Sequence, residues 1–453
     1  MSTVDRTRAP EPAALRDFSF PEVQRRDLPG GLDLRVARMS RLPVVSAVLF
    51  LRAGEATLDE TRAGLACLTG DALEGGTRNR SGSDLSEALE RVGARMGVAT
   101  GWEGTSVSLS CLAERFEEAL ALLAEAVREP AFPEAEVERA RSQTLAGIRQ
   151  RAMDPASLAS DVAARMIFAP GVPYARPVAG TVASVEQFGR DHLRGYAGAS
   201  FLPGDGGFVV VGDVDAGEVA DLAGRHFAGW SGSPPGGGDF VVEPSSRERA
   251  IHVVDRPGSV QSEIRVGHVG VARSDPDVFS LTVLNTLLGG AFTSRLNLNL
   301  RERNGFTYGV RSRFALRSRP GAFEVRTAVG TEATAPAVRE IVAELEGLVG
   351  GGPTGTEVEA ARDYIAGTFP LRQETAGQVA GRISELVVYH LEDDYHDTYR
   401  DRIRAVQVEE AHAAARRHVR PAEAQVVIVG DATAVVPALE GLELGPVKVV
   451  TPL

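Results

Sequence analysis

The sequence reads Leu300-Arg301-Glu302-Arg303-Asn304-Gly305-Phe306-Thr307-Tyr308-Gly309 two thirds of the way along a chain of 453 residues. Leu296 and Leu300 share a helical face, and Gly305 stands where a helix would end. The β-branched and aromatic residues of 306–314 predict a strand. We therefore expect Arg301 in the last helical turns and Tyr308 at the start of the strand. A guanidinium and a phenol at such a corner can hold the carbonyls or carboxylates of a peptide. The alternative is that Arg301 is a solvated helix charge and Tyr308 an aromatic at the edge of the core.

The composition is that of a globular chain with more than one domain. Hydrophobic residues make up 43% and charged residues 24% of the sequence. The net charge of -12 argues against nucleic acid as a partner. No apolar run reaches the roughly 18 residues that a membrane span needs. The charged first twenty residues lack the apolar core of a signal peptide, so we expect a cytoplasmic protein, or a periplasmic one if an export signal has been removed.

The sequence contains an internal repeat. The segment Val426–Asp431 repeats Val209–Asp213 at an offset of 218 residues. Two further echoes have offsets of 221 and 214 residues: they pair 136–141 with 357–362, and 73–76 with 287–290. Three echoes at nearly one offset indicate a duplicated domain, because the period is too long for a solenoid unit.

The domain boundaries follow from composition. Residues 1–23 are expected to be a mobile N-terminal arm, and the Gly-, Pro- and Ser-rich residues 231–246 an interdomain linker. The two domains are then 24–230 and 247–453. Both mix strands with amphipathic helices, so the predicted fold class is α+β: two duplicated domains, each a mostly antiparallel sheet packed with helices.

The chain resembles the pitrilysin/insulinase family of zinc peptidases, in particular its short branch that includes the mitochondrial processing peptidase. The duplication, the Arg301–Tyr308 stretch and the segment Gly64–Thr77 carry the resemblance over nearly the whole chain. Active members have His-x-x-Glu-His within the Gly64–Thr77 frame, where two His bind zinc and the Glu activates water. The resemblance implies that the domains form half of a clamshell.

Every one of these chemical positions is occupied by another residue here. Cys67 stands for the first His, Gly70 for the general base and Asp71 for the second His. The third ligand of the family falls on Gly147, and a supporting Glu falls on Ala140. The first histidine in the chain is His192, so this helix offers no imidazole. We therefore expect no metal and no general base in this chain, and zinc only in a partner subunit.

The second half retains the other part of the family's site. In the family, an Arg and a Tyr seven residues apart reach from the C-terminal domain to the zinc site of the other domain, where they help to hold the substrate. Arg301 and Tyr308 have this spacing within Leu-Arg-Glu-Arg-Asn-Gly-Phe-Thr-Tyr-Gly, which is similar to the family's Leu-Arg-Glu-Lys-x-Gly-x-x-Tyr.

The resemblance predicts a non-catalytic subunit of a heterodimeric zinc metallopeptidase. Such a chain would be inactive alone and would bring Arg301 and Tyr308 to an unfolded peptide at the partner's zinc site. The alternative is a scaffold or peptide-binding protein with a peptidase fold, possibly a homodimer, that cleaves nothing.

Overall fold

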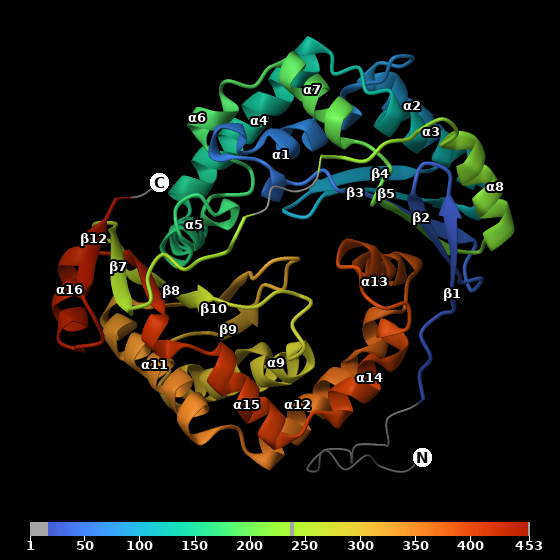
Figure 1. The fold of residues 1–453 in the computed structure, drawn as a ribbon. Helices are drawn as coiled ribbons and strands as arrows, with labels where there is room; N and C mark the ends of the chain where they lie inside the picture. The colour runs from blue at the N-terminus through green and yellow to red at the C-terminus, as the bar shows by residue number, and fades with distance from the viewer. Residues whose placement is uncertain (1–16, 236–239, 452–453) are drawn as a thin grey trace, which may run out of the picture.

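The computed structural model describes residues 17–235 and 240–451. The chain forms two halves, and each is built on a six-stranded sheet (Figure 1). The strands of the first sheet are β1 (Val23–Leu28), β2 (Leu32–Arg38), β3 (Val44–Leu51), β4 (Arg95–Thr100), β5 (Thr105–Leu112) and β6 (Gly207–Gly212). Those of the second are β7 (Ala250–Asp255), β8 (Gln261–Val269), β9 (Val310–Phe314), β10 (Ala322–Gly330), β11 (Gln425–Gly430) and β12 (Val447–Val450).

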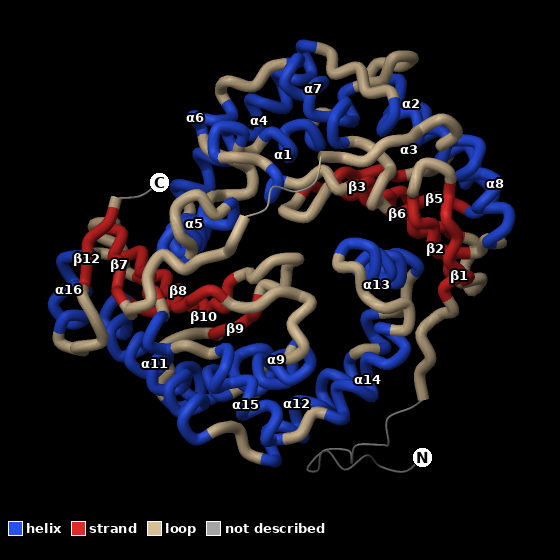
Figure 2. The backbone as a smooth tube through the Cα atoms, in the orientation of Figure 1, coloured by secondary structure: helices blue, strands red, loops and turns tan. Residues whose placement is uncertain are grey.

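Helices cover the outer side of each sheet, as Figure 2 shows. The helices of the first half are α1 (Leu65–Asp71), α2 (Gly82–Arg91), α3 (Phe116–Arg128), α4 (Glu134–Met153), α5 (Pro155–Ile167), α6 (Val182–Val185), α7 (Arg190–Ser200) and α8 (Ala216–His226). Those of the second are α9 (Val278–Asn285), α10 (Arg295–Asn297), α11 (Thr334–Gly351), α12 (Gly355–Thr368), α13 (Ala376–Val388), α14 (Tyr395–Ala405), α15 (Val408–His418) and α16 (Ala432–Glu440). None of the helices in the described part of the chain is long and apolar enough to cross a membrane.

The strand orders confirm the predicted fold class. The first sheet has the order β1-β2-β6-β3-β5-β4 and the second β12-β7-β11-β8-β10-β9. Five strands of one sheet correspond in order and direction to five of the other. The second strand in each order is parallel to the third, β2 to β6 and β7 to β11, and all later neighbours pair antiparallel. The sixth strand differs, because β1 forms an antiparallel hairpin with β2 whereas β12 is parallel to β7. Antiparallel pairs predominate in both sheets.

The sequence patterns explain these elements. The strands β6 and β11 consist of apolar residues and glycine, apart from Gln425 at the start of β11, and are buried along their whole length, as expected for strands in the middle of a sheet. In β5 buried and more accessible residues alternate, because one face packs against helices. The helix α2 begins with a capping box in which the Ser81 hydroxyl accepts the Asp84 N–H and the Asp84 carboxylate accepts the Ser81 N–H.

One helix of each half crosses to the sheet of the other. On the first sheet, Ile383 and Leu386 of α13 share a buried cluster with Val209 of β6. On the second, Leu158 and Val162 of α5 pack against β11. Each sheet therefore lies between its own helices and one helix from the other half, which covers the inner face of the sheet.

A glycine lies under each crossing helix. A Cβ on Gly207 of β6 would lie 2.6 Å from Val387 Cγ1, and a Cβ on Gly267 of β8 would lie 2.8 Å from Ile167 Cδ1. Since real Cβ atoms do not approach so closely, any side chain at these positions would push the helix away. The two glycines therefore allow the exchange of α5 and α13.

The tips of two hairpins form a further contact between the halves. The Glu103 carboxylate, between β4 and β5, accepts the backbone N–H of Ser318 at 3.0 Å. The Arg317 guanidinium lies 5.2 Å from the Trp102 ring and 4.2 Å from the Tyr174 ring. These cation–π contacts fix the hairpin between β9 and β10 against the first half.

Two segments differ from the sequence predictions. Residues 1–16 of the expected mobile arm lie outside the described residues, but Phe18 and Phe20 pack against the second half. In the expected linker, residues 236–239 are not described, and the Phe240 ring lies 5.4 Å from that of Tyr174. Aromatic side chains within both segments bury apolar surface, which the Gly, Pro and charge content did not reveal.

Candidate functional site

The turn that carries Arg301 is helical, as predicted, but wider than an α-helix. Residues Leu298–Arg303 form a π-helical turn after α10. Leu296 and Leu300 are completely buried and anchor the turn. Gly305, with φ of +65°, reverses the chain, and the Phe306 N–H then donates to the Leu300 carbonyl at 2.8 Å. The buried leucines thus leave Arg301 on the accessible side of the turn.

The Arg301 side chain lies on an exposed aromatic ring. Its guanidinium carbon is 3.5 Å from the centre of the Phe292 ring, and its Nε donates to the Glu302 carboxylate at 2.9 Å. The Phe292 side chain is 72% exposed, and Arg301 only 16%. The ring and the Glu302 carboxylate, which also lies 2.7 Å from Nη2, together orient the guanidinium, and its remaining N–H groups suit a carbonyl or a carboxylate.

Tyr308 is 98% exposed. Its loop is nevertheless held in place, because Thr327 Oγ1 lies within hydrogen-bond distance of both Thr307 Oγ1, at 2.9 Å, and the Gly309 carbonyl, at 3.0 Å. The predicted strand 306–314 is shorter than expected, since β9 begins only at Val310. Tyr308 therefore stands in the loop before the strand, and its ring contributes little to the core.

A buried asparagine ties the two parts of this corner together. The Asn297 amide donates to the Val310 carbonyl at 2.9 Å and to the Ala291 carbonyl at 3.2 Å. Its side-chain oxygen accepts the Val310 N–H at 3.1 Å. Through these bonds, Asn297 fixes the start of β9 against the segments that carry Phe292 and Arg301.

Cys67 is buried in α1, and its thiol hydrogen-bonds to the Val178 carbonyl at 3.3 Å. Burial raises the pKa of Cys67 strongly, and the nearby carboxylates of Glu55 and Asp71 raise it further. A zinc ligand would have to be the thiolate. The surroundings of Cys67 therefore favour an uncharged thiol.

The position of the general base has no room for a side chain. A Cβ on Gly70 would lie 2.3 Å from Thr100 Oγ1 and 3.4 Å from Val98 Cγ1, both in β4. Asp71 is accessible. Partial desolvation raises the pKa of its carboxyl group, and a hydrogen bond from the Thr144 hydroxyl partly offsets this rise. The strand β4 thus takes up the space at Gly70.

The expected position of the third ligand, Gly147, has open space around it, in contrast to Gly70. A Cβ on Gly147 of α4 would meet no atom within 4 Å, so this side of the helix faces open space. Ala140, at the position of the supporting Glu, is buried. A buried thiol, a blocked glycine and an open glycine do not fit a zinc ion, and we derive no chemical step through a metal at this place.

A buried ion pair organises the helix that would have carried the motif. The Glu55 carboxylate is 0% exposed and accepts the N–H groups of Gly64 and Cys67 at 3.0 and 3.1 Å. Arg176 donates to the same carboxylate at 3.0 Å. Burial raises the pKa of Glu55, and these bonds partly offset the rise. Because Gly64 has φ of +88°, which is not helical, α1 begins at Leu65.

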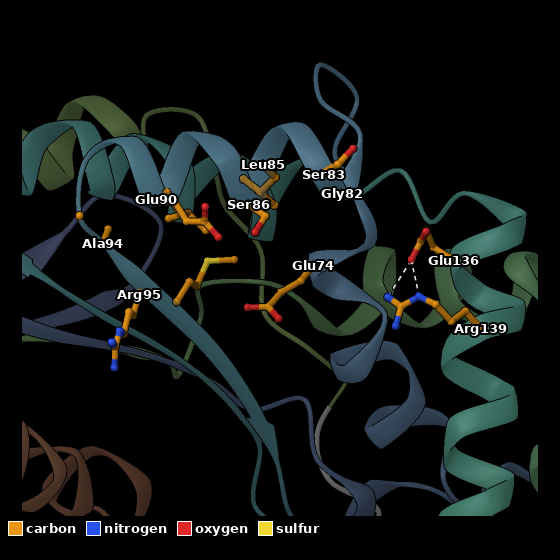
Figure 3. A pocket seen from close by; sticks show the side chains of 13 residues that line it. Glu74, Gly82, Ser83, Leu85, Ser86, Glu90, Ala94, Arg95, Glu136 and Arg139 are labelled. Carbon is orange, nitrogen blue, oxygen red and sulfur yellow. Dashed lines mark hydrogen bonds and ion pairs between the residues drawn. The ribbon is translucent and has the colours of Figure 1, made fainter.

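A cavity of about 910 Å³ lies beside this degenerate motif, between α2, β4 and α4 (Figure 3). Glu74 and Glu90 point into it, whereas the Arg95 side chain extends away from them. Glu136 pairs with Arg139 at 2.7 Å at the far side. Desolvation raises the pKa of Glu74. Its lining mixes apolar residues with three glutamates, two arginines and the hydroxyls of Ser83 and Ser86, and it contains no histidine or cysteine.

Sequence reasoning missed Phe292 and the Glu55–Arg176 pair. Phe292 is an aromatic residue two positions after Gly290, and that placement was the only available signal. Glu55 and Arg176 are 121 residues apart, and no local pattern connects them. Both relationships depend on tertiary contacts.

The described residues contain one group of three possible metal ligands, Asp275, Asp277 and His418. His418 Nε2 lies 2.8 Å from the Asp277 carboxylate, and Arg417 binds that carboxylate at the same distance. The Asp277 N–H donates to Asp275. Ion pairs and a turn at the start of α9 thus account for this cluster.

Two family models match the chain. The model described as insulinase, peptidase family M16, matches residues 36–172. The model described as peptidase M16 inactive domain matches residues 187–365.

Similar proteins and structures agree with these matches. An uncharacterized zinc protease of Streptomyces coelicolor is 27% identical, covering 87% of this chain and 86% of that protein. The non-peptidase homolog YmxG of Helicobacter pylori is 24% identical, covering 86% and 90%. The crystal structure of a peptidase M16 inactive domain from Pseudomonas fluorescens superposes with a TM-score of 0.84 at 25% identity, covering 90% and 98%.

Proposed function

Because the chain belongs to the insulinase family, peptidase M16, we propose that it is the non-catalytic subunit of a heterodimeric zinc metallopeptidase. In this proposal it supplies Arg301 and Tyr308 to an unfolded peptide at the zinc site of a homologous partner subunit. Its own first half, with Cys67, Gly70, Asp71 and Gly147, contributes neither a metal nor a general base.

The observation that carries this proposal is the exposure of Tyr308 on a firmly held loop. An aromatic side chain that is 98% exposed gains almost nothing from burial within its own chain. Its loop is nonetheless fixed by Thr327, and Asn297 ties the following strand to the Arg301 turn. Such an arrangement is expected where a side chain has to be presented to a ligand in one geometry.

The two side chains have distinct roles in the proposal. The Tyr308 hydroxyl donates a hydrogen bond to the carbonyl oxygen of the peptide as negative charge develops there. Arg301, with its guanidinium oriented by Phe292 and Glu302, binds a neighbouring carbonyl or carboxylate. A partner's zinc would supply the polarisation of the scissile bond and the activated water.

The second candidate is an inactive scaffold with a peptidase fold. It is supported by the similarity to a protein named a non-peptidase homolog. In that case the chain holds peptides or proteins without contributing to their hydrolysis, and Arg301 and Tyr308 have no effect on any cleavage rate.

Reconstitution distinguishes the two candidates. The chain is co-expressed with a homologous subunit that has an intact His-x-x-Glu-His motif, and the mixture is analysed by size-exclusion chromatography and by hydrolysis of an unfolded peptide. A mixed complex that cleaves faster than either subunit supports the first candidate. A stable complex without that gain supports the scaffold.

The cytoplasmic location remains a prediction of the sequence.

A further inference from the structure

A cavity of about 410 Å³ lies beside Phe292, between the segment that precedes α10 and the first turns of α12. This volume is within the range of about 300–1,000 Å³ that is usual for binding pockets. Three exposed apolar side chains line it, Phe292, Leu298 and Tyr364. Three large apolar groups around one hollow, all open to solvent, are typical of a binding surface rather than of an isolated core edge.

The charged groups of this pocket neutralise each other. Arg295 donates to Glu357 through Nε at 2.5 Å and through Nη2 at 2.6 Å. Glu357 also accepts the N–H and the hydroxyl of Thr354, both at 2.8 Å. This pairing lowers the pKa of Glu357 to about 2, so the carboxylate stays ionised and bound. A charged ligand group would find no free counter-charge on the walls, whereas an apolar group meets an apolar surface.

The duplicated fold does not by itself produce an apolar pocket. The corresponding place in the first half is the cavity of Figure 3, which is lined by Glu136, the counterpart of Glu357 in the sequence repeat. There, Glu74 and Glu90 point into the space, and the Arg95 side chain extends away from them. The first cavity thus combines apolar Leu85, Leu89 and Met96 with the carboxylates of Glu74 and Glu90. In the second cavity the carboxylate, Glu357, is paired with Arg295.

The pocket is continuous with the site of Arg301. Phe292 forms part of its wall, and the same ring carries the Arg301 guanidinium at 3.5 Å. A peptide whose carbonyl or carboxylate is bound by Arg301 therefore lies at the mouth of the pocket.

We propose that this pocket, formed by Phe292, Leu298, Tyr364 and Ala360, binds an aromatic side chain of the unfolded peptide held by Arg301. The proposal rests on the proposed function, and it adds a preference of the non-catalytic subunit for peptides with a large apolar residue. The backbone contacts of Arg301 are indifferent to sequence, so the pocket supplies the selection.

The test compares two short peptides with blocked termini that differ only in a central Phe or Ala. Their binding to the full chain is measured by fluorescence anisotropy. Burying a Phe side chain is expected to make the Phe peptide bind about tenfold tighter or more. Ala360→Phe places a ring into the pocket from an accessible helix position and should abolish this preference. Leu298→Ala removes part of the wall and should reduce it.

The control is Leu371→Ala. Leu371 is also an exposed apolar residue, but it lies beyond the far end of α12, so this variant should keep the full preference. Circular dichroism verifies that each variant is folded.

Equal or undetectable binding of the two peptides would overturn the proposal. So would a preference for the Phe peptide that is preserved in both Ala360→Phe and Leu298→Ala. The same holds if these two variants keep that preference but no longer associate with the partner subunit. If the preference is absent but Arg301→Ala still weakens peptide binding, the pocket proposal fails and the proposed function stands. If Arg301→Ala has no effect on binding or cleavage, it is the proposed function that fails.

Discussion

The guanidinium carbon of Arg301 lies 3.5 Å from the centre of the Phe292 ring, so an exposed aromatic residue orients the charge that the sequence singled out. The Phe292 side chain is 72% exposed, and it also lines the pocket that contains Leu298 and Tyr364. The pair therefore links the predicted peptide contact to the neighbouring apolar pocket.

Tyr308→Phe should lower turnover by the reconstituted complex without changing the melting temperature. Losing one transition-state hydrogen bond costs about 10²–10³ in rate at a dry site, and a solvent-accessible site should lie at or below the low end. Arg301→Ala should also raise KM, because it removes a charge and several donors. Arg303→Ala, an exposed arginine in the same turn, is the matched control. Wild-type kinetics for both Tyr308→Phe and Arg301→Ala would remove these residues from the peptidase reaction.

The purified chain should hold no stoichiometric zinc, and neither Gly70→Glu nor Gly147→Glu alone should create a zinc site. Gly70→Glu should destabilise the protein by about 1–3 kcal/mol, because its Cβ would overlap Thr100. Gly147→Glu should be neutral or slightly stabilising, since it enters open space and replaces a helical glycine. Thermal melting and elemental analysis of the wild type and both variants check this. One tightly bound zinc per wild-type chain would contradict the prediction.

Arg176→Met should destabilise the fold by about 3–5 kcal/mol, because it leaves the Glu55 carboxylate buried without its counter-charge. Glu55→Gln in the same background should recover part of the loss, since the group left in place is then neutral. Urea unfolding of the single and double variants measures this coupling. Additive effects of the two substitutions would show that the ion pair is not the cause.

Stability should fall as the pH drops from 6.5 towards 4. His268 is buried, and burial lowers its pKa to about 4, so the unfolded chain binds a proton in this range that the folded chain does not. His268 Nε2 accepts the Arg420 N–H at 3.0 Å and cannot do so once protonated. The contribution is present above pH 6.5, is lost on acidification, and amounts to about 3 kcal/mol at most. The stability of His268→Gln should depend less steeply on pH over this range, and equal slopes would assign the effect to other groups.

Cleavage between Pro235 and Phe240 should leave the two fragments associated. Each fragment carries a helix that completes the core of the other, α5 on the second sheet and α13 on the first. The cut protein should elute as one species and melt in a single transition. Val387→Asp in α13, which places a charge against Gly207, should allow the fragments to separate. Separation of the cut wild-type protein in buffer would show that the crossing helices do not hold the halves together.

The sequence by itself determined the duplicated α+β fold and the family. These conclusions depend on local patterns: alternation in β5, the apolar runs of β6 and β11, the repeat, and residue types at fixed spacing. The tertiary structure alone decided how the two halves combine. The exchange of α5 and α13 depends on Gly207 meeting Val387 and Gly267 meeting Ile167, contacts between residues far apart in the chain. The same holds at the site, where the sequence identified Arg301 and Tyr308. Only packing placed Phe292 under the guanidinium and an apolar pocket beside it, because burial and exposure depend on which segments meet in space.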